Sequence, residues 1–165
     1  MKKIILGLCG LLLCSTVLAH DLKPWNGAPT PPLALKDLND KARKLEDYRG
    51  KVVMVQFWAT YCTPCLKEMP SMQRLEKKLA DKPFVILAVN MGETDKEVRT
   101  FLTKLKVDFT ILMDTDGEAL GAWKVFVAPS SFLIDPQGKI RYTVQGGEEW
   151  DNEEYVKVIS EMLTK

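Results

Sequence analysis

Two cysteines separated by two residues are the part of the sequence best suited to chemistry. Cys62 and Cys65 follow the apolar run 51–58 (KVVMVQFW) and stand at the start of a helical pattern. A C-x-x-C pair in that position is typical of thiol–disulfide exchange. The unpaired N–H groups and partial positive charge of a helix N-terminus stabilise a thiolate, so we expect Cys62 to be the nucleophile. Cys65, one turn further on, would then resolve the mixed disulfide.

Metal binding is the structural alternative for such a pair. A zinc site needs four ligands, but the other cysteines are Cys9 and Cys14, and the single histidine is His20. Asp114 and Asp116 resemble calcium ligands but lack the further spaced oxygens of a calcium loop, so a turn is the better interpretation. We therefore expect neither a metal nor another cofactor.

The N-terminus has the pattern of a signal peptide. A basic start at Lys2 and Lys3 precedes an apolar segment, and Val17-Leu18-Ala19 fits the small-x-small rule for cleavage after Ala19. An uncleaved anchor is the alternative, although the uncharged stretch 4–19 is shorter than the roughly 20 apolar residues of a spanning helix. Export to the periplasm would leave only Cys62 and Cys65. A pair so close in sequence braces a fold poorly, which favours a reactive role.

Composition sets further limits. The chain has 165 residues, 46% hydrophobic and 27% charged, which suits one globular domain. Its formal net charge is +1, so it has no electrostatic footprint for nucleic acid, and we expect no nucleic-acid partner.

Hydrophobic periodicity predicts the elements that must position the cysteines. We expect an extended lead-in over 20–32, a short strand or hairpin within 33–50, and then the order βαβα followed by ββα. This order predicts an α/β fold with a central mixed sheet and helices on both faces. The predicted strands are 51–58, 84–90, 110–113, 130–134 and 140–144, and the predicted helices are 64–80 with Pro70 inside, 94–106, 118–123 and 151–163.

Several motifs in order resemble one family. Residues 57–65 (FWATYCTPC) resemble the active-site segment of thioredoxin-like proteins, and 67–70 (KEMP) continue it as in TlpA/ResA-like exported thiol-disulfide oxidoreductases. Residues 50–53 (GKVV) are similar to the family's entry to its central strand, and 127–135 (VAPSSFLID) to its cis-proline strand. The likeness extends from about Ala28 to Val158.

The resemblance implies a thioredoxin-like fold over residues 20–165, with an N-terminal extension and a central insertion near 89–93 (VNMGE). It also implies a redox-active disulfide between Cys62 and Cys65, and a cis Pro129 packed against it. Ala128 would present its backbone groups to a substrate strand, because a proline beside it has no N–H to pair. Tyr61 and Pro64 would complete the substrate contact.

Two positions depart from the family's pattern. Ordinary thioredoxins carry a buried aspartate on the central strand where this chain has Gln56, and Tyr61 stands where a tryptophan is usual. The resemblance matches Glu93 to the acidic residue that this subfamily places near its cysteines. Because an amide cannot carry the proton for a buried thiol, we expect Glu93 to supply the carboxyl group. A solvated loop glutamate is the alternative for Glu93, and Trp123 and Trp150 are interpreted as packing residues.

The leading hypothesis is therefore a thiol-disulfide oxidoreductase of the cell envelope that reduces specific exported proteins. By resemblance these include apocytochrome c or copper-site proteins, with an inner-membrane electron donor and a monomeric state. The alternatives are a Cu(I)-binding chaperone, in which two thiolates hold the metal, a peroxidase, and a purely structural binding module.

Overall fold

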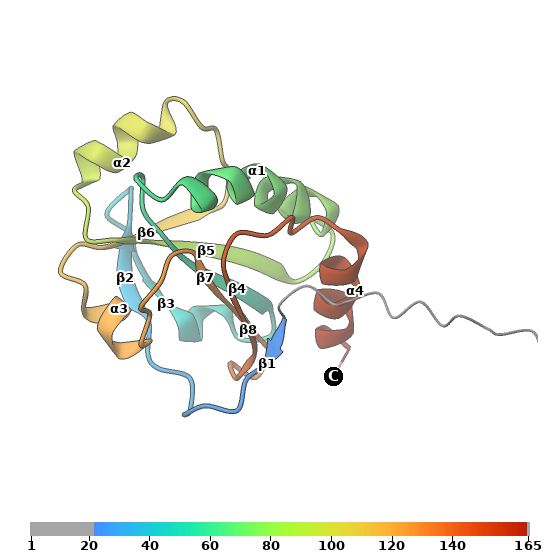
Figure 1. Ribbon diagram of the computed structural model, residues 1–165. Helices are drawn as coiled ribbons and strands as arrows, with labels where there is room; N and C mark the ends of the chain where they lie inside the picture. The colour runs from blue at the N-terminus through green and yellow to red at the C-terminus, as the bar shows by residue number, and fades with distance from the viewer. Residues whose placement is uncertain (1–21, 165) are drawn as a thin grey trace, which may run out of the picture.

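The apolar run 51–58 forms the central strand β4 (Val52–Trp58), with all of its residues buried. In the computed structural model, which describes residues 22–164, β4 lies inside an eight-stranded sheet of order β1-β8-β7-β4-β5-β6-β2-β3 (Figure 1). It runs parallel to β5 and antiparallel to β7. The other strands are β1 (Lys23–Pro24), β2 (Ala34–Asp37), β3 (Ala42–Lys44), β5 (Phe84–Met91), β6 (Thr110–Asp114), β7 (Ser130–Ile134) and β8 (Ile140–Gln145).

Both faces of the sheet are covered, which confirms the predicted layering. One face packs against α1 (Thr63–Lys78), α2 (Asp95–Leu102) and α4 (Glu153–Met162), whose buried residues share a core with Met54 and Trp58 of β4. The other face packs against α3 (Glu118–Ala122) and the 3₁₀ turn η1 (Leu45–Tyr48), with an aromatic cluster at its centre. That cluster consists of Phe57, Trp123, Phe132 and Trp25.

Most predicted elements are present, with three differences. The helix predicted over 94–106 ends at Leu102, although Thr94 and Glu97 do form its capping box. The extended lead-in contains the short strand β1, paired with β8. The segment 89–93, expected to belong to an insertion, is the end of β5 and the turn after it, and α2 and β6 follow.

The predicted signal peptide, its cleavage after Ala19, and both Cys9 and Cys14 lie outside the described residues. The domain boundary at residue 20 therefore stays a prediction. Within residues 22–164, none of the helices has the length and apolar character needed to span a bilayer.

Candidate active site

Cys62 and Cys65 form a disulfide at the end of β4. Their sulfur atoms are 2.01 Å apart and their Cα atoms 5.3 Å apart. The strand ends at Trp58, and a short loop leads to α1, which begins at Thr63 with Pro64 in its first turn. Proline is tolerated there because the N–H groups of the first helical turn have no acceptor within the helix, so none is lost. The predicted disulfide and its place at the strand-to-helix junction are both present.

The two cysteines differ in their environment. Cys62 is the N-cap of α1, and its Sγ accepts a hydrogen bond of 3.3 Å from the backbone N–H of Cys65. Cys62 keeps 9% of its surface exposed and Cys65 keeps none. The helix N-terminus therefore stabilises negative charge on the sulfur that solvent can reach, as a nucleophilic thiolate requires.

The strand β7 brings a cis proline to the same edge of the sheet. The peptide bond between Ala128 and Pro129 is cis, as the resemblance implies. Ser130, the next residue, pairs with Phe57 near the end of β4. Pro129 is buried and Ala128 half-buried, so the turn before β7 lies beside the segment that leads into Cys62.

Glu93 binds the loop that precedes the cysteines. Its Oε2 accepts hydrogen bonds of 2.7 Å from the backbone N–H of Thr60 and 2.7 Å from Nδ2 of Asn90. The Thr60 hydroxyl donates to its Oε1. Glu93 thus fixes the loop two residues before Cys62, and the proton-carrying role expected for it stays a prediction.

A second carboxyl group, which the sequence interpretation missed, lies on α1 itself, one helical turn after Cys65. Glu68 is three residues after Cys65, on the same face of the helix, and is only 2% exposed. Its Oε1 accepts a hydrogen bond of 2.6 Å from Nε2 of Gln56 on β4, and its Oε2 accepts one of 3.1 Å from Nε1 of Trp150. The sequence did contain a signal for this site, because Glu68 stands on the apolar stripe of a helix, one turn after a reactive cysteine.

Burial raises the pKa of Glu68 to about 7. The hydrogen bonds from Gln56, the backbone N–H of Glu148 and Trp150 favour the ionised form and limit the rise, while the negative charge of Glu148 adds to it. A carboxyl group with this pKa can both accept and release a proton near neutral pH, which is what general acid–base catalysis requires.

The β8–α4 loop, residues 146–152, connects the parts of the site. The N–H of Gly146 donates a hydrogen bond of 3.0 Å to the carbonyl oxygen of Pro129. The N–H of Glu148 donates one of 3.0 Å to Oε2 of Glu68. Gly147 approaches the C-x-x-C turn so closely that a Cβ there would lie 3.1 Å from the carbonyl oxygen of Pro64. A side chain there would require the turn or the loop to move by a few tenths of an ångström, so glycine suits this approach. Through this segment the loop contacts the redox turn, the cis proline and the buried carboxyl group.

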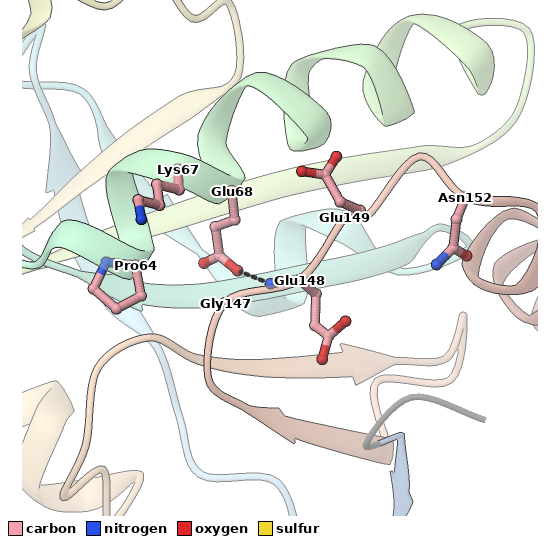
Figure 2. A pocket seen from close by; sticks show the side chains of 7 residues that line it. All are labelled: Pro64, Lys67, Glu68, Gly147, Glu148, Glu149 and Asn152. Atoms are coloured by element: carbon pink, nitrogen blue, oxygen red, sulfur yellow. Dashed lines mark hydrogen bonds between the residues drawn. The ribbon is translucent and has the colours of Figure 1, made fainter. Parts of the chain in front are cut away.

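A pocket of about 390 Å³ opens between α1 and this loop. Figure 2 shows Glu68 pointing from α1 toward the backbone of Glu148, with Pro64 and Lys67 on the same helix. Pro64 belongs to the C-x-x-C turn, so the pocket lies between that turn and the β8–α4 loop, and Glu68 forms part of its wall. The remaining lining residues are Gly147, Glu149 and Asn152.

The other predicted residues fall in different places. Tyr61 is 75% exposed beside Cys62, whereas Trp123 is buried in the aromatic cluster and packs as expected. Trp150 is buried too, but its bond to Glu68 makes it part of the site as well as of the core. Asp114 caps α3 by accepting from the N–H groups of Ala119 and Leu120, which agrees with the turn interpretation.

Comparison with known proteins agrees with this geometry. Residues 26–143 match the model of the AhpC/TSA family. The chain belongs to the AhpC/TSA family. Two relatives are described as thiol-disulfide oxidoreductase ResA. One, from Bacillus thuringiensis subsp. konkukian, is 35% identical over 158 residues, which are 95% of this chain and 91% of the relative. The other, from Bacillus subtilis, is 36% identical over 137 residues, which are 83% and 76% of the two chains.

Solved structures of similar proteins share the fold. A candidate thiol:disulfide interchange protein DsbE from Chlorobium tepidum superposes with a TM-score of 0.76 at 31% identity, over 88% of this chain and 99% of that one. A candidate thioredoxin from Neisseria meningitidis superposes with a TM-score of 0.74 at 28% identity, over 84% and 93%. The AhpC/TSA member described here therefore has a thioredoxin-like fold, as the motifs implied.

Proposed function

We propose that the protein is a thiol-disulfide oxidoreductase of the cell envelope that reduces disulfides in exported proteins. The observation that carries the proposal is the asymmetric pair at the start of α1. Cys62 caps the helix and keeps some exposure, while Cys65 is fully buried behind it. The relatives described as thiol-disulfide oxidoreductases support the same activity.

The reaction follows from this arrangement. In the reduced protein the Cys62 thiolate attacks one sulfur of the substrate disulfide, and the other substrate sulfur leaves as a thiolate. The Cys65 thiol then loses its proton and attacks Sγ of Cys62. This step forms the intramolecular disulfide of 2.01 Å and releases the second substrate sulfur as a thiolate. Two electrons pass to the substrate, and the buried carboxyl group of Glu68 accepts the proton from Cys65.

The surface around the pair suits a protein substrate. The large apolar side chains with the greatest exposure among residues 22–164 are Phe126 at 87%, Tyr61 at 75% and Val127 at 50%. They belong to the loop before Cys62 and to the segment before the cis proline, where a substrate must approach. Apolar side chains exposed next to a reactive sulfur favour a polypeptide over a small polar disulfide. We include Ala128 and Pro64 in the proposed contact, because Ala128 precedes the cis proline and Pro64 lies in the redox turn.

The cellular setting extends the proposal. The signal-like N-terminus supports export to the periplasm, where a reductase must draw electrons through the inner membrane from a dithiol donor. Because the pair is used once per substrate, a monomer with one C-x-x-C is sufficient for the cycle. Cu(I) binding and peroxide reduction are the other chemistries open to two such thiols.

Trapping tests the proposal. In Cys65→Ser the mixed disulfide on Cys62 cannot be resolved, so we expect exported proteins to remain covalently attached and to be released by dithiothreitol. Cys62→Ser is the matched control and should retain none. Equal capture by the two variants would contradict the assignment of Cys62 as the nucleophile. Turnover of hydrogen peroxide without protein substrate would favour the peroxidase instead.

A further inference from the structure

A buried amide on the central strand holds the carboxyl group of Glu68. Gln56 is fully buried on β4, and its Nε2 donates 2.6 Å to Oε1 of Glu68. The other two donors to Glu68, the N–H of Glu148 and Nε1 of Trp150, come from the β8–α4 loop and reach Oε2. Each oxygen is therefore held from a different side. Of these contacts, the one from Gln56 links the carboxylate to the strand that leads into Cys62.

Burying the amide of Gln56 lowers the stability of the fold. In the described part of the chain, Oε1 of Gln56 has no hydrogen-bond partner, and neither has the hydroxyl of Ser131, the residue opposite Gln56 on β7. Ser131 is 1% exposed. A buried polar atom without a partner lowers stability, and an apolar side chain of the same length would avoid that cost. A glutamine in this position therefore needs another explanation, and its contact with Glu68 supplies one.

The direction of the hydrogen bond decides what the amide does. An amide N–H can only donate, so Nε2 favours the ionised form of Glu68, against the effect of burial. The other charged groups near Glu68 are Lys67 on α1 and Glu148 and Glu149 on the β8–α4 loop. The ring of Trp150 also contacts the ring of Tyr155 on α4, with the two ring centroids 4.5 Å apart. Of the donors to the carboxylate, Gln56 makes the shortest contact.

We propose that Gln56 is a positioning residue for thiol–disulfide exchange, whose amide holds the Glu68 carboxylate in the acceptor orientation that receives the Cys65 proton. The inference rests on the proposed function, because it assigns Glu68 a part in the exchange. Gln56 itself carries no proton. It keeps Glu68 able to accept one when Cys65 attacks the mixed disulfide, and to return it when the disulfide is reduced again.

The first test reads Glu68 directly and needs no activity. The side-chain carboxyl carbon of Glu68 is followed by ¹³C NMR against pH in the oxidised protein, where the cysteines do not titrate. Gln56→Met keeps the length of the side chain and removes the donor. Since a hydrogen bond to a charged group is lost, we expect the midpoint to rise by about one to two pH units. If Gln56→Met does not fold, Gln56→Leu serves in its place with the same expectation.

A matched control separates this role from simple packing. Gln73 is also a buried glutamine, but it lies on α1 and bonds the N–H of Asp108 and the side chain of Glu76. Gln73→Met should lower stability and leave the Glu68 midpoint unchanged. An unchanged midpoint in Gln56→Met, or an equal shift in Gln73→Met, would overturn the proposal.

The second test connects the contact to the chemistry. Alkylation of Cys62 by iodoacetamide is measured against pH in the reduced protein, with and without Glu68→Gln. We expect Gln56→Met to displace the pH profile only where Glu68 is present. The same displacement in both backgrounds would overturn the role of Gln56. A wild-type protein that exchanges no disulfides would instead overturn the proposed function, and the NMR result would show which of the two had failed.

Discussion

The carboxylate of Glu93 holds the backbone N–H of Thr60 at 2.7 Å, although the two residues lie 33 positions apart in the sequence. The contact joins the end of β5 to the loop between β4 and α1. Because that loop carries the chain into Cys62, the position of the nucleophile depends on a side chain from the turn that follows β5. The approach of the redox pair is thus set by tertiary contacts as well as by the start of α1.

Removing this contact should loosen the loop. In Glu93→Ala we expect the amide hydrogen of Thr60 to exchange with solvent about tenfold faster or more, since the variant loses a charge-assisted hydrogen bond worth more than about 1.4 kcal/mol. Hydrogen–deuterium exchange followed by NMR measures this. Glu97→Ala is the control, because it breaks the capping box at Thr94 without contacting Thr60. Unchanged Thr60 protection in Glu93→Ala would refute the anchoring role.

The raised pKa of Glu68 predicts an unusual pH dependence of stability. A carboxyl group whose folded pKa is about 7 binds its proton more tightly in the folded state than in the unfolded state, whose pKa is 4.5. Its stabilising contribution is complete below pH 4.5 and is lost as the pH rises to about 7, by about 3 kcal/mol. Urea unfolding of the oxidised protein between pH 4.5 and 8 should show this loss in the wild type, but not in Glu68→Gln.

Exposed Glu149 provides the comparison for that experiment. It lies on the same pocket with a 70% exposed side chain, so Glu149→Gln should keep the wild-type slope. Parallel curves for the wild type and Glu68→Gln would show that burial of Glu68 does not control its titration.

Trp150 should contribute to stability in a pH-dependent way. Its Nε1 donates to Oε2 of Glu68, and Trp150→Phe removes that donor while keeping an aromatic ring. The lost bond matters most when Glu68 is ionised, so we expect Trp150→Phe to lose about 1–2 kcal/mol more at pH 8.5 than at pH 5. Trp123→Phe is the matched control, since its Nε1 donates to the backbone carbonyl of Pro32, which does not titrate. Equal pH dependence in the two variants would argue against the contact.

Phe126 should distinguish protein substrates from small ones. It is 87% exposed, so Phe126→Ser should leave the free energy of unfolding within about 0.5 kcal/mol of the wild type. Loss of an apolar contact of about 1.4 kcal/mol in the complex would raise KM for a protein disulfide about tenfold. We expect a smaller effect on a small aromatic disulfide. An equal rise of KM for both substrates would show that Phe126 affects the exchange reaction itself and not the docking of a protein substrate.

Local patterns predicted much of this site because its key parts are local. The apolar run 51–58 predicts a buried strand, and Cys62 and Cys65 lie within one helical turn. Pro129 belongs to a motif that can be recognised from a few neighbouring residues. Glu93 was singled out by the family resemblance, but its contact with Thr60 depends on the folded chain and could not be read from the sequence.

Glu68 shows where local reasoning ends. Its partners Glu148 and Trp150 lie 80 and 82 residues away, and no periodicity within α1 indicates them. Strand β1 was missed for a related reason, because a two-residue strand is too short for any alternation and exists only through its pairing with β8. Trp150 was assigned to packing correctly, but an indole that packs and also donates cannot be recognised without its acceptor.

The absence of a side chain at Gly147 has a mechanical consequence. Its backbone lies against Pro64, and the residues on either side of it hold Pro129 and Glu68. An alanine at position 147 would place its Cβ 3.1 Å from the carbonyl oxygen of Pro64, so the redox turn or the loop would have to move by a few tenths of an ångström. Because the neighbouring residues donate hydrogen bonds to Pro129 and Glu68, such a displacement would also strain the contacts of the cis proline and of the buried carboxyl group.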